Sequence, residues 1–362
     1  MNAIDLTRIE VLIGTGGIGT GMFFELEGDH TLTRNESRVG ILRDWRDYCK
    51  LHIVLHYFAM LRSPQSAAIV RILPVGKVGD DASGAKLLEQ MAAAGMEVSY
   101  VGKVSDAPTL FSVSFIYPDR TGGNITASNS ASGRVSPDDI GLVEEVMAVY
   151  EGKGIAVSLP EVSLRARVAL LALATRHRLF RSASFTVAEM DEVKRGGLLK
   201  EVDLLTINHD EADALAGGVA RAGQKPVECG SLRDALTEVI ARVNPDLRLC
   251  LTMGAAGSWA FWRKTWEYIP PAHVKSVNTA GAGDAYLAGV LTGLVNGRPF
   301  IRRAPARREN LAEGGISTAC DYGSMVAGLS TTSPRTIHPD LSIAMVREYA
   351  LANGIQLDDH SL

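Results

Sequence analysis

Residues 278–284 read Asn-Thr-Ala-Gly-Ala-Gly-Asp, and the apolar run 285–295 follows them directly. Apolar residues in that run recur at the helical spacing, namely at Tyr286, Leu287, Val290, Leu291 and Leu294. Small residues before a helix predict a tight turn whose backbone N–H groups point outward. Because those N–H groups lack partners within the helix and the helix dipole adds positive charge, such a turn attracts anions.

Asp284 ends this stretch, although a carboxylate repels phosphate and a site that only binds anions would avoid one. Its presence makes sense if it takes a proton from a hydroxyl while neighbouring N–H groups stabilise charge on a phosphoryl group in transfer. A simple N-cap aspartate after a glycine-rich turn is the structural alternative. The turn therefore indicates phosphoryl-transfer chemistry.

Three further segments combine an apolar run with a polar or glycine-rich turn. Residues 75–81 read Val-Gly-Lys-Val-Gly-Asp-Asp, residues 203–211 end in Asn-His-Asp-Glu, and residues 249–257 read Leu-Cys-Leu-Thr-Met-Gly-Ala-Ala-Gly. With residues 278–284, and in this order, they resemble the ribokinase-like (PfkB-type) carbohydrate kinases. The family signature is Asp-Thr-x-Gly-Ala-Gly-Asp, so Asn278 replaces its first aspartate.

The resemblance covers residues 70–335 well and the N-terminal part poorly, and it implies an α/β fold. This is the ribokinase-like three-layer α/β/α arrangement, with a mostly parallel central sheet and a small β-sheet lid. It implies one kinase domain over residues 1–362, with the lid contributed by about residues 20–45 and 97–130.

Two β-rich runs, at residues 22–27 and 110–117, fall in the expected lid regions. In the family the lid closes over the sugar and excludes water, which would compete with the acceptor hydroxyl for the phosphoryl group. It can also form a homodimer interface. An ordinary hairpin at a sheet edge is the alternative interpretation.

Apolar runs alternate with helical patterns along the chain, which predicts a mostly parallel sheet covered on both faces. Ligands of such folds bind beyond the carboxyl ends of the strands, where the motifs lie. The predicted strands span residues 9–13, 68–74, 155–158, 182–186, 204–207, 249–252 and 258–261. The predicted helices span residues 82–94, 137–150, 163–176, 187–195, 210–215, 231–243, 285–295, 315–330 and 341–351.

The resemblance implies that Asp284 is the catalytic base. It implies that Gly281, Ala282 and Gly283 form an anion hole through their backbone N–H groups, since glycine lets the phosphate come close. These four positions are the expected catalytic group.

The resemblance also implies that Asn208 approaches the phosphates of ATP and that Glu211 organises Mg²⁺ through water. One carboxylate suffices because Mg²⁺ keeps several waters and takes few protein ligands. The structural alternative is a capping pair, with Glu211 as the third helical residue after Asn208.

Thr252, Gly254 and Gly257 are implied to contact nucleotide phosphate and ribose, although a plain strand-turn-strand connection would look the same. The adenine pocket is expected to include Ser324, in a stretch 319–328 whose small residues leave room for a flat ring. Close helix packing explains such residues equally well.

The N-terminal region departs from the family pattern. An aspartate that binds sugar hydroxyls is expected near Gly19, and residues 48–56 stand where the family has a glycine-rich segment opening a helix. The identity of the acceptor therefore cannot be inferred from the family resemblance. Residues that could bind it, or instead be packed or solvated, are Asp29, Asn35, Arg38, His52 and His56.

We therefore expect an ATP-dependent kinase that phosphorylates a hydroxyl, preferably a primary one, of a sugar or sugar derivative. A nucleoside kinase of the same fold and a sugar or nucleotide sensor without turnover are alternatives. Gly14-x-Gly16-x-x-Gly19 also fits the fingerprint of an NAD-dependent oxidoreductase, but that fingerprint needs a helix next. Residues 22–29 read as strand and turn instead. A K⁺ requirement stays open because Asn278 can alter the cation site that many relatives have beside the anion hole.

The chain has 362 residues, 46% of them hydrophobic, and a formal net charge of −4. Its interspersed charges give no support to a nucleic-acid surface or a polybasic membrane anchor, so neither a nucleic acid nor a membrane is expected as a partner. Four separated cysteines argue against a zinc site or a disulfide scaffold. No signal peptide or membrane-length apolar run is visible, so we expect a cytoplasmic protein. A solvated basic cluster is expected at Arg302, Arg303, Arg307 and Arg308.

Overall fold

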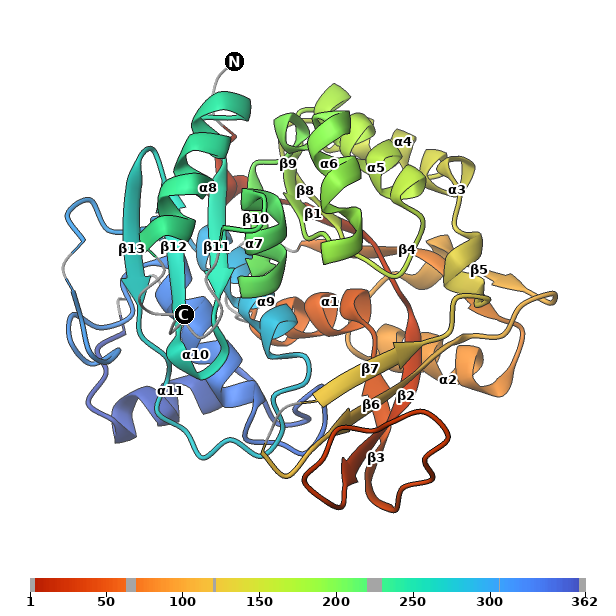
Figure 1. Ribbon diagram of the computed structural model, residues 1–362. Helices are drawn as coiled ribbons and strands as arrows, with labels where there is room; N and C mark the ends of the chain where they lie inside the picture. The colour runs from red at the N-terminus through yellow and green to blue at the C-terminus, as the bar shows by residue number, and fades with distance from the viewer. Residues whose placement is uncertain (1–3, 63–69, 120–121, 220–229, 306, 358–362) are drawn as a thin grey trace.

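The computed structural model describes residues 4–62, 70–119, 122–219, 230–305 and 307–357. Its centre is a nine-stranded sheet in the order β13-β12-β11-β10-β9-β8-β1-β4-β5 (Figure 1). The strands from β11 to β5 in that order are parallel, and β12 and β13 continue the edge antiparallel. Their bounds are β1 Val11–Thr15, β4 Arg71–Gly79, β5 Val101–Val104, β8 Gly154–Ser158, β9 Phe180–Ala183, β10 Leu204–Asn208, β11 Arg248–Thr252, β12 Ser258–Trp262 and β13 Thr265–Ile269.

Helices cover both faces of this sheet, as its strand sequences require. Along β1, Leu12 packs into one hydrophobic core while Val11 and Ile13 pack into the core on the opposite face, since successive side chains of a strand point to opposite sides. Two buried faces explain why the central strands are continuously apolar.

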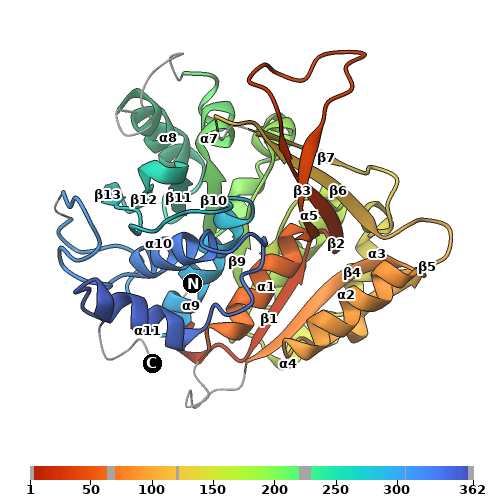
Figure 2. The ribbon, with the colours of Figure 1, turned by 90° about the horizontal axis from the view of Figure 1, so that it is seen from below.

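One face carries five helices, of which α9 packs between α1 and α10 (Figure 2): α1 Lys50–Met60, α2 Ala82–Ala93, α9 Ala282–Val295, α10 Ala319–Ser330 and α11 Ile343–Ala352. The other face carries α3 Pro137–Gly141, α4 Glu144–Val149, α5 Leu164–Arg176, α6 Met190–Gly196, α7 His209–Ala216 and α8 Gly230–Val243. Short 3₁₀ turns lie at Leu6–Arg8, Val98–Tyr100, Ala131–Arg134, Val187–Glu189, Leu198–Glu201 and Gly254–Ala256.

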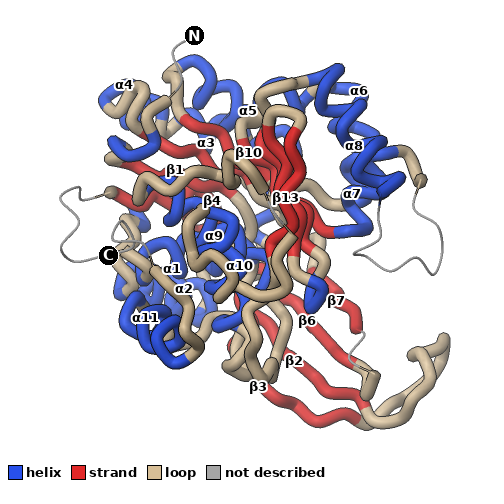
Figure 3. Tube along the Cα trace, turned by 90° about the vertical axis from the view of Figure 1, so that its left-hand side faces the viewer, coloured by secondary structure: helices blue, strands red, loops and turns tan. Residues whose placement is uncertain are grey.

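A second, four-stranded sheet projects from the body in the order β3-β2-β6-β7 (Figure 3). It joins two distant parts of the chain, because β2 (Gly19–Leu26) pairs in parallel with β6 (Leu110–Ile116). The outer strands, β3 (Gly40–Tyr48) and β7 (Gly122–Thr126), pair antiparallel with these two. Both β-rich runs predicted from the sequence are strands of this small sheet, so the expected α/β architecture with a second sheet is confirmed.

Several predicted bounds differ from the structure for local reasons. The predicted helix 137–150 is two helices, and the predicted strand 182–186 ends at Ala183, after which Thr186 caps a 3₁₀ turn. The predicted helix 315–330 begins only at Ala319, because Gly315 has φ +64° and Thr318 then caps the helix. The predicted strand 68–74 is β4, although residues 68–69 lie outside the described part.

Among the described helices, none combines the length and the apolar character that crossing a bilayer requires.

Candidate active site

The 278–284 turn lies between two cavities. Asp284 and residues 278–281 line a cavity of about 400 Å³. Ala282 and Gly283 line a second cavity of about 540 Å³, and Thr279 lines both. A short wall of seven residues therefore separates two ligand-sized spaces beyond the carboxyl ends of the parallel strands.

Asp284 lies in the first turn of α9, and its side chain is 15% exposed. The Lys50 ammonium, at the start of α1, stands 3.6 Å from Asp284 Oδ1. Burial raises the pKa of Asp284, and the Lys50 cation opposes that rise. The pKa of Lys50 is in turn raised by the Asp284 carboxylate. The pair places one carboxylate and one cation on the wall of the smaller cavity.

The backbone N–H groups of the turn are those expected to form an anion hole. Gly281 has φ +78° and precedes α9, which is a backbone conformation that favours glycine. No backbone acceptor is recorded among the described residues for the N–H groups of Gly281 and Gly283, whereas Ala282 donates to the Thr279 carbonyl (3.2 Å). A Cβ on Gly283 would meet nothing within 4 Å. Within the described part of the chain, two of the three expected N–H donors thus have no backbone acceptor.

Glu161 forms another wall of the smaller cavity, just beyond β8. Its Oε2 accepts the backbone N–H of Lys50 (3.1 Å), and burial raises the pKa of Glu161 to about 7. Gly17 makes room for this carboxylate, since a Cβ there would stand 2.2 Å from Glu161 Oε2. The N-terminal glycines thus serve close packing, and a strand, β2, follows them rather than the helix that a dinucleotide fingerprint needs.

The small sheet closes the remaining side of this cavity with polar groups from three strands. Asp47 of β3 is buried, and its Oδ2 accepts the hydroxyl of Ser114 on β6 (2.7 Å). The amide of Asn124 on β7 donates to the same hydroxyl (2.9 Å). The smaller cavity therefore offers carboxylate, hydroxyl and amide groups.

The larger cavity is lined by Thr252, Gly254 and Gly257 after β11, and by Ser324 of α10. Gly257 has φ +82°, and a Cβ there would lie 2.4 Å from the Ile269 carbonyl. The Ser324 hydroxyl donates to the Pro270 carbonyl (2.7 Å). Four of the residues expected at the nucleotide thus lie along one cavity.

The small residues of α10 fit both interpretations given above, namely close helix packing and open space for a ligand. Gly323 packs against α9, where a Cβ would stand 2.6 Å from a Val290 methyl. Ser324, Ala327 and Gly328 line the larger cavity instead. One side of the helix allows close packing and the other leaves open space.

Asn208 and Glu211 form a reciprocal capping box at the start of α7. Asn208 Oδ1 accepts the Glu211 N–H (2.9 Å), and Glu211 Oε2 accepts the Asn208 N–H (2.8 Å). Neither lines the two cavities, but Asn208 is paired with Thr252 across the sheet. Burial raises the pKa of Glu211, and the charges of Lys50 and Asp284 lie near enough to influence it. The capping alternative is thus present, at the edge of the site.

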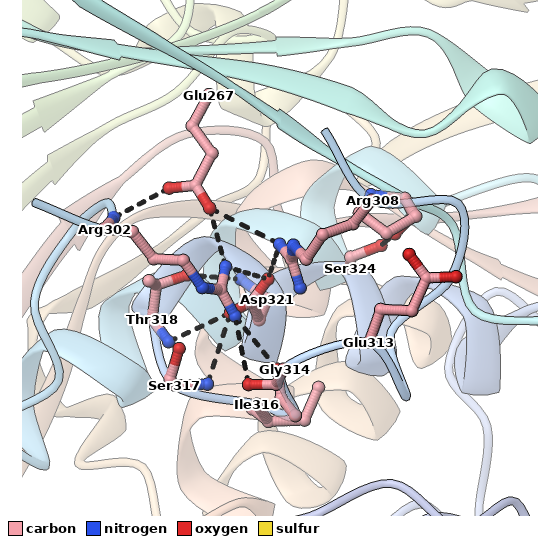
Figure 4. Close-up of polar contacts among 12 residues, drawn as sticks. Glu267, Arg302, Arg308, Glu313, Gly314, Ile316, Ser317, Thr318, Asp321 and Ser324 are labelled. Carbon is pink, nitrogen blue, oxygen red and sulfur yellow. Dashed lines mark hydrogen bonds and ion pairs between the residues drawn. The ribbon is translucent and has the colours of Figure 1, made fainter. Parts of the chain in front are cut away.

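Two arginines of the expected solvated cluster are withdrawn from solvent, Arg308 buried and Arg302 half-buried, which corrects that expectation. Arg302 and Arg308 converge on Glu267 of β13 and Asp321 of α10 (Figure 4). Both carboxylates are fully buried, so two opposite charges compensate each of them. This network fixes the start of α10 one turn before Ser324.

None of the five acceptor contacts expected from the sequence lies along either cavity. Lys50 and Ile53 of α1 face the smaller cavity, whereas His52 is turned away and buried, and its pKa is lowered by burial to about 3. His56, one turn later, shares that face, and burial lowers its pKa to about 4.

The other three, Asp29, Asn35 and Arg38, lie in the loop between β2 and β3. There Arg38 pairs with Glu36 (2.7 Å) and donates to the His30 carbonyl, so it holds the loop together.

Sequence reasoning missed Lys50, Glu161 and Asp47. Glu161 follows the carboxyl end of a predicted strand, and that position was the signal that could have identified it. Lys50 lies within the segment 48–56, from which only His52 and His56 were predicted to contact the acceptor. The sequence around Asp47 did not indicate a site residue, because the strand that carries it, β3, was not predicted.

A family model described as pfkB family carbohydrate kinase matches residues 68–343. The chain belongs to this family. Among curated proteins, this pfkB-family chain is 30% identical to a Salmonella thompson fructokinase over 164 residues, which is 40% of the chain and 73% of that protein. A Salmonella typhimurium fructokinase matches at 30% over 53% of its length. A Staphylococcus aureus ribokinase is 22% identical over 71% of the chain and 74% of its own.

Solved structures show the same fold. Ribokinase from Giardia lamblia superposes with a TM-score of 0.71 at 17% identity, covering 96% of this chain and 99% of that one. Ribokinase from Cryptococcus neoformans in complex with ADP gives a TM-score of 0.68 at 19% identity, covering 94% of this chain and 99% of that one. A Burkholderia thailandensis nucleoside kinase in complex with inosine gives 0.68 at 15%, over 95% and 99%.

Proposed function

We propose that this pfkB-family protein transfers the γ-phosphoryl group of ATP to a hydroxyl, preferably a primary one, of a neutral sugar or sugar derivative. The supporting observation is the 278–284 wall, with Asp284 in one cavity and Gly283 in the other. A phosphoryl group that passes from one cavity to the other has to pass this wall.

In the proposed reaction Asp284 takes the proton of the acceptor hydroxyl. The resulting oxygen bonds to the γ-phosphorus while the bond to the leaving oxygen of ADP breaks. The N–H groups of Gly281, Gly283 and, after release from Thr279, Ala282 stabilise the charge on the transferred group. Lys50 orients Asp284 through their ion pair and favours its charged form.

We assign the larger cavity to ATP. Thr252, Gly254 and Gly257 contact phosphate and ribose, and the base lies along Ser324 and its neighbours on α10. A ribokinase of the same fold holds ADP, which supports this assignment.

Mg²⁺ is taken to be held by Glu211 through water, beside Asn208 and the phosphates. When bound, it neutralises phosphate charge. The described residues contain no group of three or more metal-ligating side chains, and a single carboxylate fits an ion that keeps most of its waters.

We assign the smaller cavity to a neutral polyol. Asp47 and Glu161 accept hydrogen bonds from hydroxyls, and they repel a second carboxylate or a phosphate on the acceptor. A nucleoside is the second candidate, because Phe23 and Phe115 also line this cavity and could stack on a base.

We propose that the small sheet acts as a lid of this single kinase domain and pairs with a second copy. Exposed apolar side chains on it support the pairing: Ile41 is 45% exposed, Phe111 36% and Ile125 65%.

A panel of neutral sugars, sugar acids and nucleosides, scored by ADP release, tests the proposal. A neutral sugar should exceed its sugar acid by roughly a hundredfold in kcat/KM, because like charges repel. A sugar acid as best acceptor would contradict the acceptor class. ATP binding without turnover on any acceptor would favour a sensor, and NAD(H) binding alone an oxidoreductase.

A further inference from the structure

Asn278 stands where the family signature has an aspartate, and it is 6% exposed. Its Oδ1 accepts the N–H of Ala280 (3.0 Å), and its Nδ2 donates to the carbonyl of Pro334 (2.8 Å). One partner can only donate and the other can only accept, so a single orientation of the amide satisfies both. An aspartate could bind Ala280 equally well, but its second oxygen would face the Pro334 carbonyl.

The neighbouring carbonyl oxygens already accept hydrogen bonds from the protein. Thr331 O accepts the N–H groups of Val277 (2.7 Å) and Asn278 (3.1 Å). Thr336 O accepts the Tyr57 hydroxyl (3.1 Å). These oxygens, with Pro334 O, come from the stretch after α10.

That same stretch supports the anion-binding turn. A Cβ on Gly281 would stand 3.1 Å from Thr336 O, so the two backbones are in close contact. The Asn278–Pro334 hydrogen bond crosses between them. The interaction that holds these two backbone segments together therefore also fixes the N–H groups that are proposed to bind the phosphoryl group.

We propose that the Asn278 amide holds the anion-binding turn in place of a monovalent cation, so that phosphoryl transfer by this chain needs no K⁺. The family resemblance implies a K⁺ site beside this turn, but the residues present do not fit one. Bound K⁺ replaces its hydration shell with protein oxygens. Here the Asn278 side chain presents an N–H donor at the crossing, carries no charge to compensate a cation, and uses the Pro334 oxygen itself. Asn278 is thus a positioning residue.

The test compares the wild-type protein in potassium, sodium and tetramethylammonium chloride at one ionic strength. Two readouts are taken: kcat with the best acceptor, and the melting temperature with a non-hydrolysable ATP analogue. Asn278→Asp is measured alongside. Asn244→Asp is the matched control, since the Asn244 amide also donates to backbone carbonyls, those of Leu199 and Val202 (2.9 and 2.8 Å), far from the site.

Wild type should show the same kcat and melting temperature in all three salts. Asn278→Asp should lose at least about tenfold in kcat without K⁺, because an unpaired buried carboxylate faces a carbonyl. Potassium should restore its rate and raise its melting temperature in a saturable way. Asn244→Asp should show no cation preference.

A wild type that needs K⁺, or that K⁺ stabilises more than Na⁺ does, would overturn the proposal, as would indifference of Asn278→Asp to the salt. If Asn278→Asp does not fold, the wild-type comparison decides alone. The kcat readout rests on the proposed kinase function, whereas the melting readout does not. If no acceptor is phosphorylated but the melting temperatures behave as expected, the proposed kinase activity is rejected, and the proposal that the Asn278 amide replaces a cation is retained.

Discussion

The two sides of the 278–284 wall are built in different ways. On the nucleotide side, short contiguous turns such as residues 252–257 supply glycines and backbone N–H groups. On the acceptor side, Asp47, Ser114 and Glu161 come from distant parts of the chain and act through their side chains. In the proposed assignment, the first side binds a ligand part common to all ATP users, and the second distinguishes one acceptor from others.

The difference indicates where substitutions should have general effects and where they should have selective ones. A change in the turn should affect the transfer step with every acceptor, because the backbone holds the phosphoryl group. A change in the small sheet should alter the choice of acceptor and leave the use of ATP unchanged. Four predictions test this contrast, beginning with the largest effect.

Asp284→Asn should lower kcat by roughly 10²–10⁴-fold, the range for a lost general base, and leave nucleotide affinity unchanged. The change keeps the shape of the side chain but removes its basicity. Asp138→Asn, in the exposed first turn of α3, makes the same replacement away from the site and should have no effect. Near-full turnover in Asp284→Asn would refute the assigned role.

Gly283→Ala should lower kcat/KM for ATP by about tenfold to a hundredfold with every acceptor tested. The added methyl group finds open space in the protein, so the fold should persist, but it projects where the phosphate has to approach. Gly141→Ala, also in open space on α3, is the control for stability. An effect that depends on the acceptor would contradict this prediction, because it would mean that Gly283 acts on the choice of acceptor.

Asp47→Asn should raise the KM for the acceptor by about tenfold, as expected for a lost hydrogen bond to a charged group. The KM for ATP should not change, because Asp47 lines only the acceptor cavity. Steady-state kinetics with each substrate varied in turn separates the two constants. Equal changes in both would show that the small sheet does not act on the acceptor selectively.

Glu161 should make stability depend on pH in the absence of substrates. Its pKa is raised from 4.5 to about 7, so the folded state binds a proton more tightly than the unfolded chain. Between these values stability should therefore fall as the pH rises. The melting temperature of wild type relative to Glu161→Gln should decrease from about pH 4.5 to about pH 7. If the melting temperature of wild type instead rose with pH relative to that of Glu161→Gln, folding would lower the pKa of Glu161 rather than raise it.

Much of the nucleotide side could be predicted from the sequence because its motifs are local. Thr252, Gly254, Gly257 and Ser324 do lie on one cavity, and Asp284 lies on the other. The 252–257 turn follows β11, a strand with a clear apolar pattern. In such cases a few consecutive residues determine both the conformation and the position at the sheet edge.

The acceptor side could not be predicted in the same way. Asp47 reaches the cavity only because β2 pairs with both β3 and β6, and that pairing joins segments almost 100 residues apart, which no local pattern reports. The histidine pair showed the limits of helical spacing. The spacing puts His52 and His56 on one face of α1, but only the packing of α1 shows that this face is turned from the cavity.

The central claim is that Asp284 stands where the acceptor hydroxyl and the γ-phosphate meet. A crystal structure with a non-hydrolysable ATP analogue and the best acceptor tests it most directly. We predict a carboxylate oxygen of Asp284 at about 3 Å from the acceptor hydroxyl, with that hydroxyl facing the γ-phosphorus. An Asp284 side chain that points away from both ligands, or an analogue bound outside the larger cavity, would contradict the account.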